Sequence, residues 1–377
     1  MKTELIYQDE TSNKFWNIVI KGKQYTVTYG RVGTAGTSKT KEFADEAAAL
    51  KDGAKLIAAK KKKGYSEAAE KAKVVRDDYT LAGKPIKDFG STIDPATAVK
   101  LLSGYDDELK VVHKLDKLAK LPNVSEMDTL VIGAWQEAHE ELEITAILEK
   151  LIEYKSVFSG LKHLFIGDMG SEECELSWIN QADYSNFYQH FQALETFGLR
   201  GGENLKLGKI NLPNLKNLII ETGGMDKKIL QDVIASDLKN LEHLELWLGT
   251  DEYGCTIEVK DLKPILDGNY SNLKFLGLKN YYLQDELAKG FSGAAILKQI
   301  ETLELSMGIL KDEGAEALHA NDDLLNLKHI NCQFHYISEE WQKKLKTKFA
   351  AQNINLEEAE VAEEYDDETY YYVAIGE

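Results

Sequence analysis

The chain has 377 residues, 43% of them hydrophobic, and a formal net charge of −18 from 45 basic and 63 acidic side chains. The apolar fraction is that of a folded chain, the length suits two or three domains, and the acidic excess argues against a protein that coats nucleic acid over its whole surface. The average conceals two parts: residues 1–76 hold 16 Lys and Arg against 9 Asp and Glu, a net +7, and the remainder holds 29 against 54, a net −25. These opposite charges indicate two separate pieces joined in one chain.

Targeting and redox signals are weak. The first ten residues, MKTELIYQDE, contain no apolar core, and no stretch approaches 18 uncharged apolar residues, so we expect neither a signal peptide nor a membrane partner. Cys174, Cys255 and Cys332 are far apart and never form C-x-x-C, which favours small buried side chains over a disulfide framework or a local zinc site. A reducing, cytoplasmic location follows.

The first elements in the chain are a hairpin and a helix. Phe15–Ile20 is rich in aromatic and β-branched residues, Lys21–Lys23 contains a turn glycine, and Tyr25–Tyr29 alternates aromatic or apolar residues with threonine, which predicts a β-hairpin. Apolar residues from Phe43 to Ile57 recur at helical spacing, and Lys60–Lys63 follow them, as is typical of a helix whose basic end suits the helix dipole.

The run FWNIVIKGKQYTVTYGRVGTAGTSKTKEF from residue 15, followed by a helix ending in AAKKKKGY, resembles a WGR domain over about residues 1–66. The resemblance implies an α+β domain, at residues 1–75, with an antiparallel sheet and one helix. In family members that sense DNA breaks beside a poly(ADP-ribose) polymerase, the signature Trp and Arg contact the DNA backbone. The matching positions are Tyr29, Gly30 and Arg31, so this sequence has Tyr in place of the signature Trp.

Each candidate DNA-binding residue also has a structural interpretation. The chain has only three arginines (Arg31, Arg76 and Arg200), and the planar fork of Arg31 could grip a phosphate or simply hold its own loop. Tyr29 shares a strand face with Tyr25 and Val27 and could be core. The four lysines at the helix end are either a phosphate-binding patch or a solvated helix end: Lys60, Lys61, Lys62 and Lys63.

Residues 76–120 are predicted to form a linker and an N-terminal cap. The stretch 64–100 is polar and mixed, with Pro85 and Pro95, which indicates a linker or irregular bridge. Helical spacing of apolar residues within 106–120 predicts a helix that caps the next domain.

Residues 121–350 repeat one pattern, Φ-x-x-Φ-x-Φ-x, where Φ is apolar. The eight matching segments are 127–133, 161–167, 194–200, 215–221, 241–247, 273–279, 300–306 and 327–333. One short strand and one helix every 20 to 34 residues is the signature of leucine-rich repeats, and it predicts an α/β solenoid with parallel strands on a concave face and helices outside.

The longer text, for example LFIGDMGSEECELSWINQADYS (164–185) and LEHLELWLGTDEYG (241–254), resembles one bacterial leucine-rich-repeat family. Related proteins that join a WGR domain to such repeats are called molybdate-metabolism-regulator-like. This resemblance implies the fold and assigns no biochemical role.

The third, fifth and seventh positions of each repeat should face the concave side. Aromatic and charged residues gather there in the middle repeats, and such side chains dominate protein interfaces. We therefore expect a protein-binding patch, or, alternatively, an extra loop or the acidic tail that covers it. Gly198 and Gly277 would leave room beside it for a ligand or a bulky partner side chain. The patch comprises Arg200, Glu221, His243, Glu245, Trp247 and Phe275.

No motif predicts catalysis, a metal site or a cofactor. His163, His243 and His329 occupy one row but lie three repeats apart, about 14 Å, too far to share an ion. His139-Glu140-Glu141 lacks the second histidine of H-E-x-x-H.

Residues 351–377 form an acidic, Tyr-rich tail. Eight of the twelve residues 357–368 are acidic, and the following Tyr370–Ile375 could add a strand to an exposed sheet edge. Together the sequence predicts a non-enzymatic adaptor whose repeats bind a protein partner and whose WGR domain docks a second macromolecule. The alternative is a protein that binds DNA ends or nicks through the WGR domain.

Overall fold

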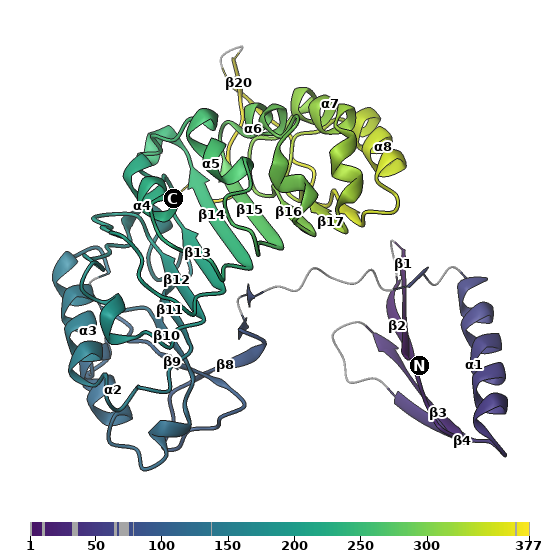
Figure 1. The fold of residues 1–377 in the computed structure, drawn as a ribbon, viewed down its shortest axis with the longest axis horizontal. Coiled ribbons are helices and arrows are strands. Elements are labelled where there is room, and N and C mark those ends of the chain that lie inside the picture. The colour runs from purple at the N-terminus through teal and green to yellow at the C-terminus, as the bar shows by residue number, and fades with distance from the viewer. Residues whose placement is uncertain are drawn as a thin grey trace. The chain divides into compact units, whose positions relative to one another are not determined.

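The computed structural model describes residues 2–9, 12–31, 37–63, 66–67, 75–77, 79–136, 138–365 and 368–376. The chain separates into two compact units, Met1–Ala72 (unit 1) and Lys73–Glu377 (unit 2) (Figure 1).

Unit 1 is an antiparallel sheet with one helix, as the sequence predicts. Its strands are β1 (Lys2–Asp9), β2 (Ser12–Lys21), β3 (Gln24–Arg31), β4 (Thr37–Glu42) and β5 (Ser66–Glu67), in the order β4-β3-β2-β1-β5, and its helix is α1 (Glu46–Lys61). The predicted hairpin is confirmed: Lys21 pairs with Gln24, and Gly22 supplies the positive φ of +55° that the tight turn needs. Asp45 begins the helix by accepting a hydrogen bond from the Ala48 amide at 2.7 Å.

The core of unit 1 lies between α1 and the first strands. Trp16, Ile18, Ile20 and Val27 are buried on one face of the sheet, and α1 packs on β2 and β3 of that face. Gly53 permits this close approach, because a Cβ there would lie 2.5 Å from the Ile20 Cδ1 atom. Every residue of the edge strand β4 stays exposed, so the helix covers only part of the sheet.

Unit 2 is built on a 13-stranded, mostly parallel sheet whose strand order follows the chain from β6 to β18. Its strands are β6 (Arg76–Asp77), β7 (Thr80–Leu81), β8 (Lys84–Asp88), β9 (Ala98–Leu101), β10 (Thr129–Gly133), β11 (His163–Asp168), β12 (Thr196–Arg200), β13 (Asn217–Glu221), β14 (His243–Gly249), β15 (Phe275–Tyr281), β16 (Thr302–Glu304), β17 (His329–Asn331) and β18 (Ile354–Asn355). All eight repeat segments form strands, and they pair at the register of the motif, from Thr129 opposite His163 to Thr302 opposite His329.

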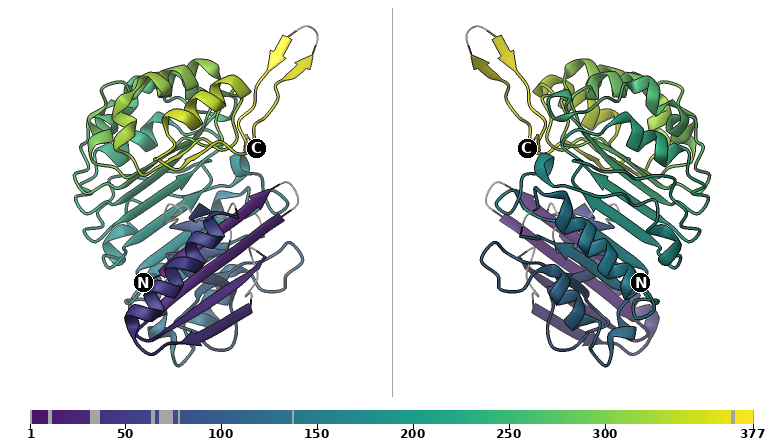
Figure 2. Two further views of the ribbon diagram at one scale, coloured as in Figure 1. Left: turned by 90° about the vertical axis from the view of Figure 1, so that its right-hand side faces the viewer. Right: turned by 90° about the vertical axis from the view of Figure 1, so that its left-hand side faces the viewer.

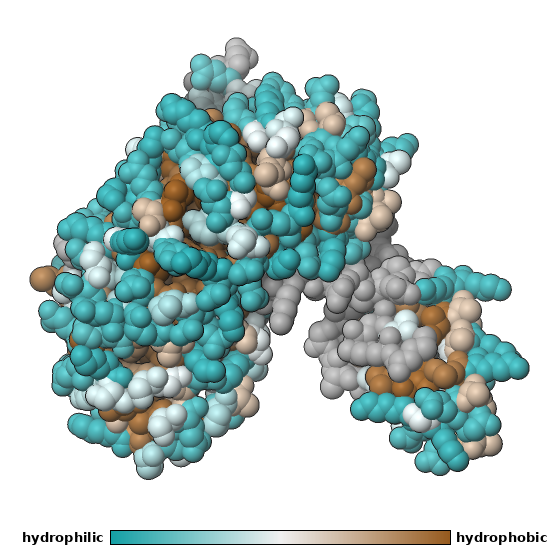
Figure 3. Space-filling view, in the orientation of Figure 1, coloured by the Kyte–Doolittle hydropathy of each residue, from teal (hydrophilic) through white to brown (hydrophobic). Residues whose placement is uncertain are grey.

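Helices follow most of these strands and lie on the outer side of the curved sheet (Figure 1). They are α2 (Val111–Leu118), α3 (Glu141–Glu153), α4 (Lys227–Ile234), α5 (Lys263–Leu266), α6 (Gln284–Gly290), α7 (Asp312–Ala320) and α8 (Glu339–Lys348). The predicted helix within 106–120 is α2. One continuous apolar core joins strands and helices, so each repeat buries its neighbour's face. On the side shown in Figure 3 the outer surface of unit 2 is mostly hydrophilic, with separate hydrophobic patches.

The predicted linker differs from the structure. Residues 76–77, 80–81, 84–88 and 98–101 form β6 to β9. Of these, β6, β7 and β8 pair as antiparallel neighbours, and β8 and β9 extend the parallel sheet. The reason is burial: Leu81 and Ala98 are fully buried against the sheet, although the surrounding sequence is polar.

The tail also differs from the prediction. Strands β19 (Glu363–Tyr365) and β20 (Glu368–Tyr370) pair with each other as a hairpin that projects from the rest of unit 2 (Figure 2). The described residues of the Tyr-rich end therefore add no strand to either edge of the large sheet, β6 or β18. Instead, the Ala374 amide donates to the Met307 carbonyl at 2.9 Å, beyond β16. Among the helices that are described, none has the length and hydrophobicity needed to cross a bilayer.

Candidate functional site

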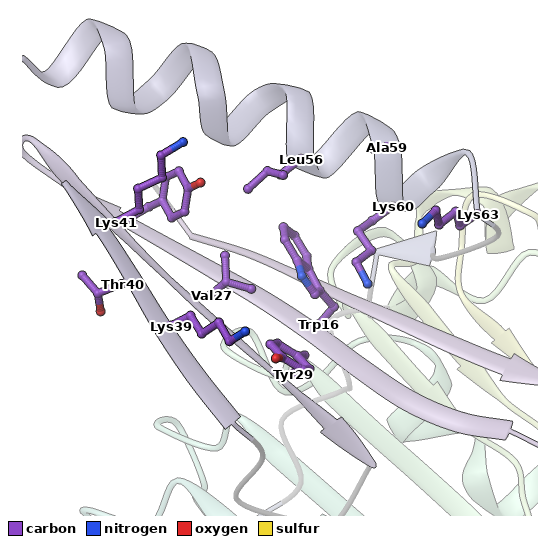
Figure 4. A pocket seen from close by; sticks show the side chains of 11 residues that line it. Trp16, Val27, Tyr29, Lys39, Thr40, Lys41, Leu56, Ala59, Lys60 and Lys63 are labelled. Carbon is purple, nitrogen blue, oxygen red and sulfur yellow. The ribbon is translucent and has the colours of Figure 1, made fainter. Parts of the chain in front are cut away.

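Unit 1 contains a groove of about 560 Å³ between α1 and strands β3 and β4 (Figure 4). It exists because α1 leaves β4 uncovered, so that Tyr29 of β3 and the helix-facing side chains of β4 meet solvent instead of the helix. Its lining residues are Trp16, Tyr25, Val27, Tyr29, Lys39, Thr40, Lys41, Leu56, Ala59, Lys60 and Lys63.

The floor of the groove is aromatic and apolar. Trp16 pairs with Tyr29 across β2 and β3, so both rings stand on the helix-facing side of the sheet. Trp16 is only 4% exposed, whereas Tyr29 is 38% exposed. Tyr29 thus shares the face of the core residues, as the alternation predicts, but presents its ring to solvent.

Four lysines surround this floor: Lys39 and Lys41 from β4, Lys60 from α1, and Lys63 from the turn that follows α1. The Lys60 ammonium lies 5.7 Å from the centre of the Trp16 ring. Lys39 extends toward Tyr29 in Figure 4. Lysine ammoniums beside exposed aromatic rings suit a ligand that is both flat and anionic.

Lys41 is paired with an acidic side chain of α1. The Lys41 ammonium donates to Asp52 at 2.9 Å, and the Tyr25 hydroxyl donates to the same carboxylate at 3.0 Å. The hydrogen bond from Lys41 holds the pKa of Asp52 below its usual value, and the same bond raises the pKa of Lys41. Asp52 thereby fixes one wall of the groove, whose lining also includes Lys39, Lys60 and Lys63.

The structure brings some of the predicted residues together and leaves others apart. Lys60 and Lys63 line the groove, whereas Lys61 and Lys62 do not. Gly30 lies in β3 opposite Phe15. The side chain of Arg31 lies outside the described part of the structure.

The lining residues that were not predicted as site residues include Trp16, Lys39 and Lys41. The pairing of β2 with β3 and of β3 with β4 places them on the face of Tyr29, since Trp16 lies opposite Tyr29 and Lys39 opposite Val27. The register of the predicted hairpin is enough to place Trp16 opposite Tyr29. Placing Lys39 and Lys41 also requires the position of β4, which the sequence does not predict.

The predicted patch on the concave face of unit 2 is assembled, but as an internally paired cluster. Glu221 is only 1% exposed and accepts from Arg200 at 2.8 Å and from Arg76 at 2.8 Å. Arg76 also donates to Asp168 at 2.6 Å, and Lys100 lies 2.8 Å from the same carboxylate. Burial alone would raise the pKa of Asp168, but Arg76 and Lys100 hold it below its usual value.

Arg76 belongs to a segment that lies on the concave face, which we call the strap (residues 75–77 and 79–86). The Arg76 guanidinium stacks on the Phe165 ring, 3.9 Å from its centre. Leu81 forms a small apolar cluster with Val131, Phe165 and Ile219, which are buried. The strap therefore covers strands β10 to β13, as the alternative of an extra covering loop anticipated.

The second half of the patch is centred on Glu245. It accepts from the Trp247 indole at 2.8 Å and from the Lys279 ammonium at 3.1 Å, and Trp247 is only 7% exposed. Burial alone would raise the pKa of Glu245, yet Lys279 and His243 hold it well below its usual value. Phe275 stacks on His243 with ring centres 3.9 Å apart and keeps part of its surface exposed.

The two glycines beside the patch leave no room for a ligand. A Cβ on Gly198 would lie 2.2 Å from the Phe165 ring, and one on Gly277 would lie 3.2 Å from both Glu245 and Phe275. Neighbouring side chains of this chain therefore occupy the space that we expected a partner to use.

Comparison with known proteins separates the two units. The model of the WGR domain matches residues 1–72. The uncharacterized protein YfeS of Escherichia coli (strain K12) is 55% identical over 67 residues, which are 18% of this chain and 28% of YfeS. The protein YehF of the same organism is 51% identical over 65 residues, 17% of this chain and 24% of YehF. The matched stretch is thus about a quarter of each of these relatives.

A solved structure matches along the whole length. The crystal structure of a protein from Bacteroides fragilis is 31% identical in sequence, with a TM-score of 0.67, and the match covers 100% of this chain and 99% of that one. The Bacteroides fragilis protein therefore shares the combination of both units with this chain.

Proposed function

The chain belongs to the same family as the Bacteroides fragilis protein and carries a WGR domain at residues 1–72, and from this premise we propose that it is a non-enzymatic nucleic-acid-binding protein. The groove of unit 1 would hold the nucleic acid, with a base on the aromatic floor and phosphates on the lysines. A WGR domain is a module that binds nucleic acid or protein, so the proposal commits to the first of these two ligands.

The observation that carries the proposal is the exposed ring of Tyr29 beside Lys39, Lys60 and Lys63 in one groove. An aromatic face stacks on any base, and ammoniums neutralise the phosphates that flank it. Tyr29 stands at the position that matches the signature Trp of related domains and offers a smaller ring. A nucleic acid with an open stack, such as a nick or an end, exposes the base face that this floor needs.

Tyr29 variants test the proposal in the full chain. Stacking of one base on an aromatic ring is worth about 1–3 kcal/mol, so Tyr29→Ala should weaken binding to a nicked duplex roughly five- to 150-fold. Tyr29→Trp should bind at least as tightly as the wild type. The measurement is fluorescence anisotropy of labelled nicked duplex at fixed, low salt.

Lysine variants supply the control. Lys39→Gln removes a groove lysine and should weaken binding, whereas Lys51→Gln removes an exposed lysine of α1 that does not line the groove and should change nothing. Equal loss in both variants would show that only the overall charge of unit 1 matters, and unchanged affinity for Tyr29→Ala would exclude the aromatic floor.

A protein partner for unit 2 is the second candidate function, with unit 2 acting as a leucine-rich-repeat solenoid in an adaptor. It is favoured by Phe275, an aromatic side chain that stays partly exposed on the concave face beyond the strap. Phe275→Ala should remove a partner captured by cross-linking from cell extract while leaving the unfolding midpoint nearly unchanged. Identical partner sets for wild type and variant would exclude this surface.

A further inference from the structure

Unit 2 contains a second cavity, of about 500 Å³, at the loops that follow strands β14 and β15. Its lining includes five tyrosines: Tyr253 and Tyr282 from these loops, and Tyr370, Tyr371 and Tyr372 from the C-terminal segment. This volume lies within the range of small-molecule sites. A concentration of tyrosine rings around one cavity is the arrangement that attracts a cation through the negative ring faces.

Two carboxylates complete the cavity. Asp251 and Glu252 line it from the short 3₁₀ helix Asp251–Tyr253, and both are exposed. Neither makes an ion pair within the part of the chain that the structure describes. The nearby Lys311 ammonium lies 5.0 Å from the centre of the Tyr371 ring, but it lies 3.7 Å from Asp285 and is not part of the lining. Among the described residues, the two carboxylates therefore add negative charge to the lining that no ion pair compensates.

The C-terminal wall of the cavity is held in place by specific hydrogen bonds. The Asn280 side chain pairs with the backbone of Ile375, donating to its carbonyl at 2.6 Å and accepting from its amide at 3.1 Å. The Tyr336 hydroxyl donates to the Tyr372 carbonyl at 2.9 Å, and Val373 is only 6% exposed. Because this wall is already ordered, a ligand would not have to fix the tail on binding.

We propose that this cavity binds a small organic cation whose nitrogen carries alkyl groups, such as a quaternary ammonium or a polyamine. The tyrosine rings contact the alkyl groups and stabilise the charge, and Asp251 and Glu252 neutralise it. An anion would meet uncompensated carboxylates, and a neutral molecule of the same shape would lose both electrostatic contributions. The proposal rests on unit 2 alone and is independent of nucleic-acid binding by unit 1.

Titration calorimetry of the full chain tests the site with three probes: choline, its neutral isostere 3,3-dimethylbutan-1-ol, and spermidine. Choline or spermidine should bind, and the neutral isostere should bind at least roughly tenfold more weakly than choline. The choline and spermidine arms distinguish a quaternary ammonium from a polyamine. Equal affinity for choline and the isostere, or no heat from either cation up to roughly 10 mM, would overturn the proposal.

Matched variants locate the binding. Asp251→Asn keeps the shape of an exposed side chain and should weaken cation binding several-fold, as should Tyr282→Leu. The controls are Glu172→Gln and Tyr105→Leu, which change exposed residues outside the cavity and should leave the affinity unchanged. Cation binding that is the same in Asp251→Asn and in the wild type would place the site elsewhere and refute the assignment.

Discussion

Arg76 shows how one residue can close a surface that the sequence leaves open. Its side chain is 9% exposed and bridges the carboxylates of Asp168 and Glu221, whose side chains are 10% and 2% exposed. Removing one partner of a buried ion pair leaves an uncompensated charge, which costs far more than the intact pair contributes. Arg76 is also one of the three arginines of the chain, the residue type best suited to hold two carboxylates.

Arg76→Ala should therefore lower the free energy of unfolding of unit 2 by about 3–5 kcal/mol. Urea denaturation followed by tryptophan fluorescence measures this change, because four of the five tryptophans lie in unit 2. The control is Lys239→Ala, which breaks the exposed pair with Asp237 and should cost less than about 1 kcal/mol. Equal effects of the two substitutions would contradict a buried bridge.

Glu245 makes the stability of this part of unit 2 depend on pH. Its pKa is held well below the usual value by Lys279 and His243 despite burial. A carboxyl whose folded pKa is depressed stabilises the fold above its unfolded pKa of about 4.3, and this stabilisation is lost as the pH falls through the folded value. The folded protein should thus lose stability below about pH 4.

Glu245→Gln tests this assignment. The variant should be less stable than the wild type at pH 7, because Lys279 loses its charged partner, and its stability should fall less steeply between about pH 4 and pH 2. Denaturant unfolding at several pH values provides both numbers. Parallel acid limbs in the two proteins would show that Glu245 contributes nothing to the pH dependence.

At the scale of elements, the strap determines which part of the concave face is accessible. Leu81 is fully buried in it, and Leu→Ala at such a site costs about 2–5 kcal/mol. Leu81→Ala should lower the stability of unit 2 by this amount and increase binding of a hydrophobic dye, as Phe165 and Ile219 become exposed. The matched control is Leu142→Ala on α3, where the side chain is 78% exposed and the loss should be under about 0.5 kcal/mol. A similar dye signal in both variants would contradict the covering role of the strap.

The sequence predicts the repeats and fails on the strap for the same reason. In the repeats, a local sequence pattern marks each strand. The Φ positions of neighbouring segments lie opposite each other in adjacent strands, as Leu164 and Phe197 do. The strap has strands of two residues whose pairing depends on burial against distant side chains, so its polar, proline-containing sequence resembles a linker. Arg76 is one of only three arginines, but the sequence assigns it no specific role.

In the groove and the tail, too, the local sequence predicts some features and misses those that depend on distant contacts. The alternation of side chains along the strands predicts the hairpin and the face on which Tyr29 lies. The groove itself exists because α1 does not cover β4, which depends on tertiary packing and cannot be deduced from the local sequence. In the tail, the tyrosines predict pairing, which occurs, but with the acidic segment of the tail itself and not with the large sheet. The local composition of a segment thus predicts whether it forms a strand, whereas burial determines which other strand it pairs with.

At the scale of the whole molecule, charge is divided between the two units. Unit 1, residues 1–72, holds 14 Lys and Arg against 9 Asp and Glu, a net +5, and unit 2 holds 31 against 54, a net −23, so a polyanion is attracted to unit 1 and repelled by unit 2. The acidic total therefore does not exclude nucleic acid. It favours unit 1 over unit 2 as the part that binds nucleic acid.

The most direct test of this account is the salt dependence of nicked-duplex binding by the full chain. If Lys39, Lys60 and Lys63 each neutralise one phosphate, the logarithm of the association constant should fall with the logarithm of salt concentration with a slope of about −3. Affinity should then drop roughly fortyfold between about 50 and 200 mM salt, and replacing the three lysines by glutamine should flatten the slope. No detectable binding at the lowest salt, or an affinity that does not change with salt, would contradict nucleic-acid binding in the groove.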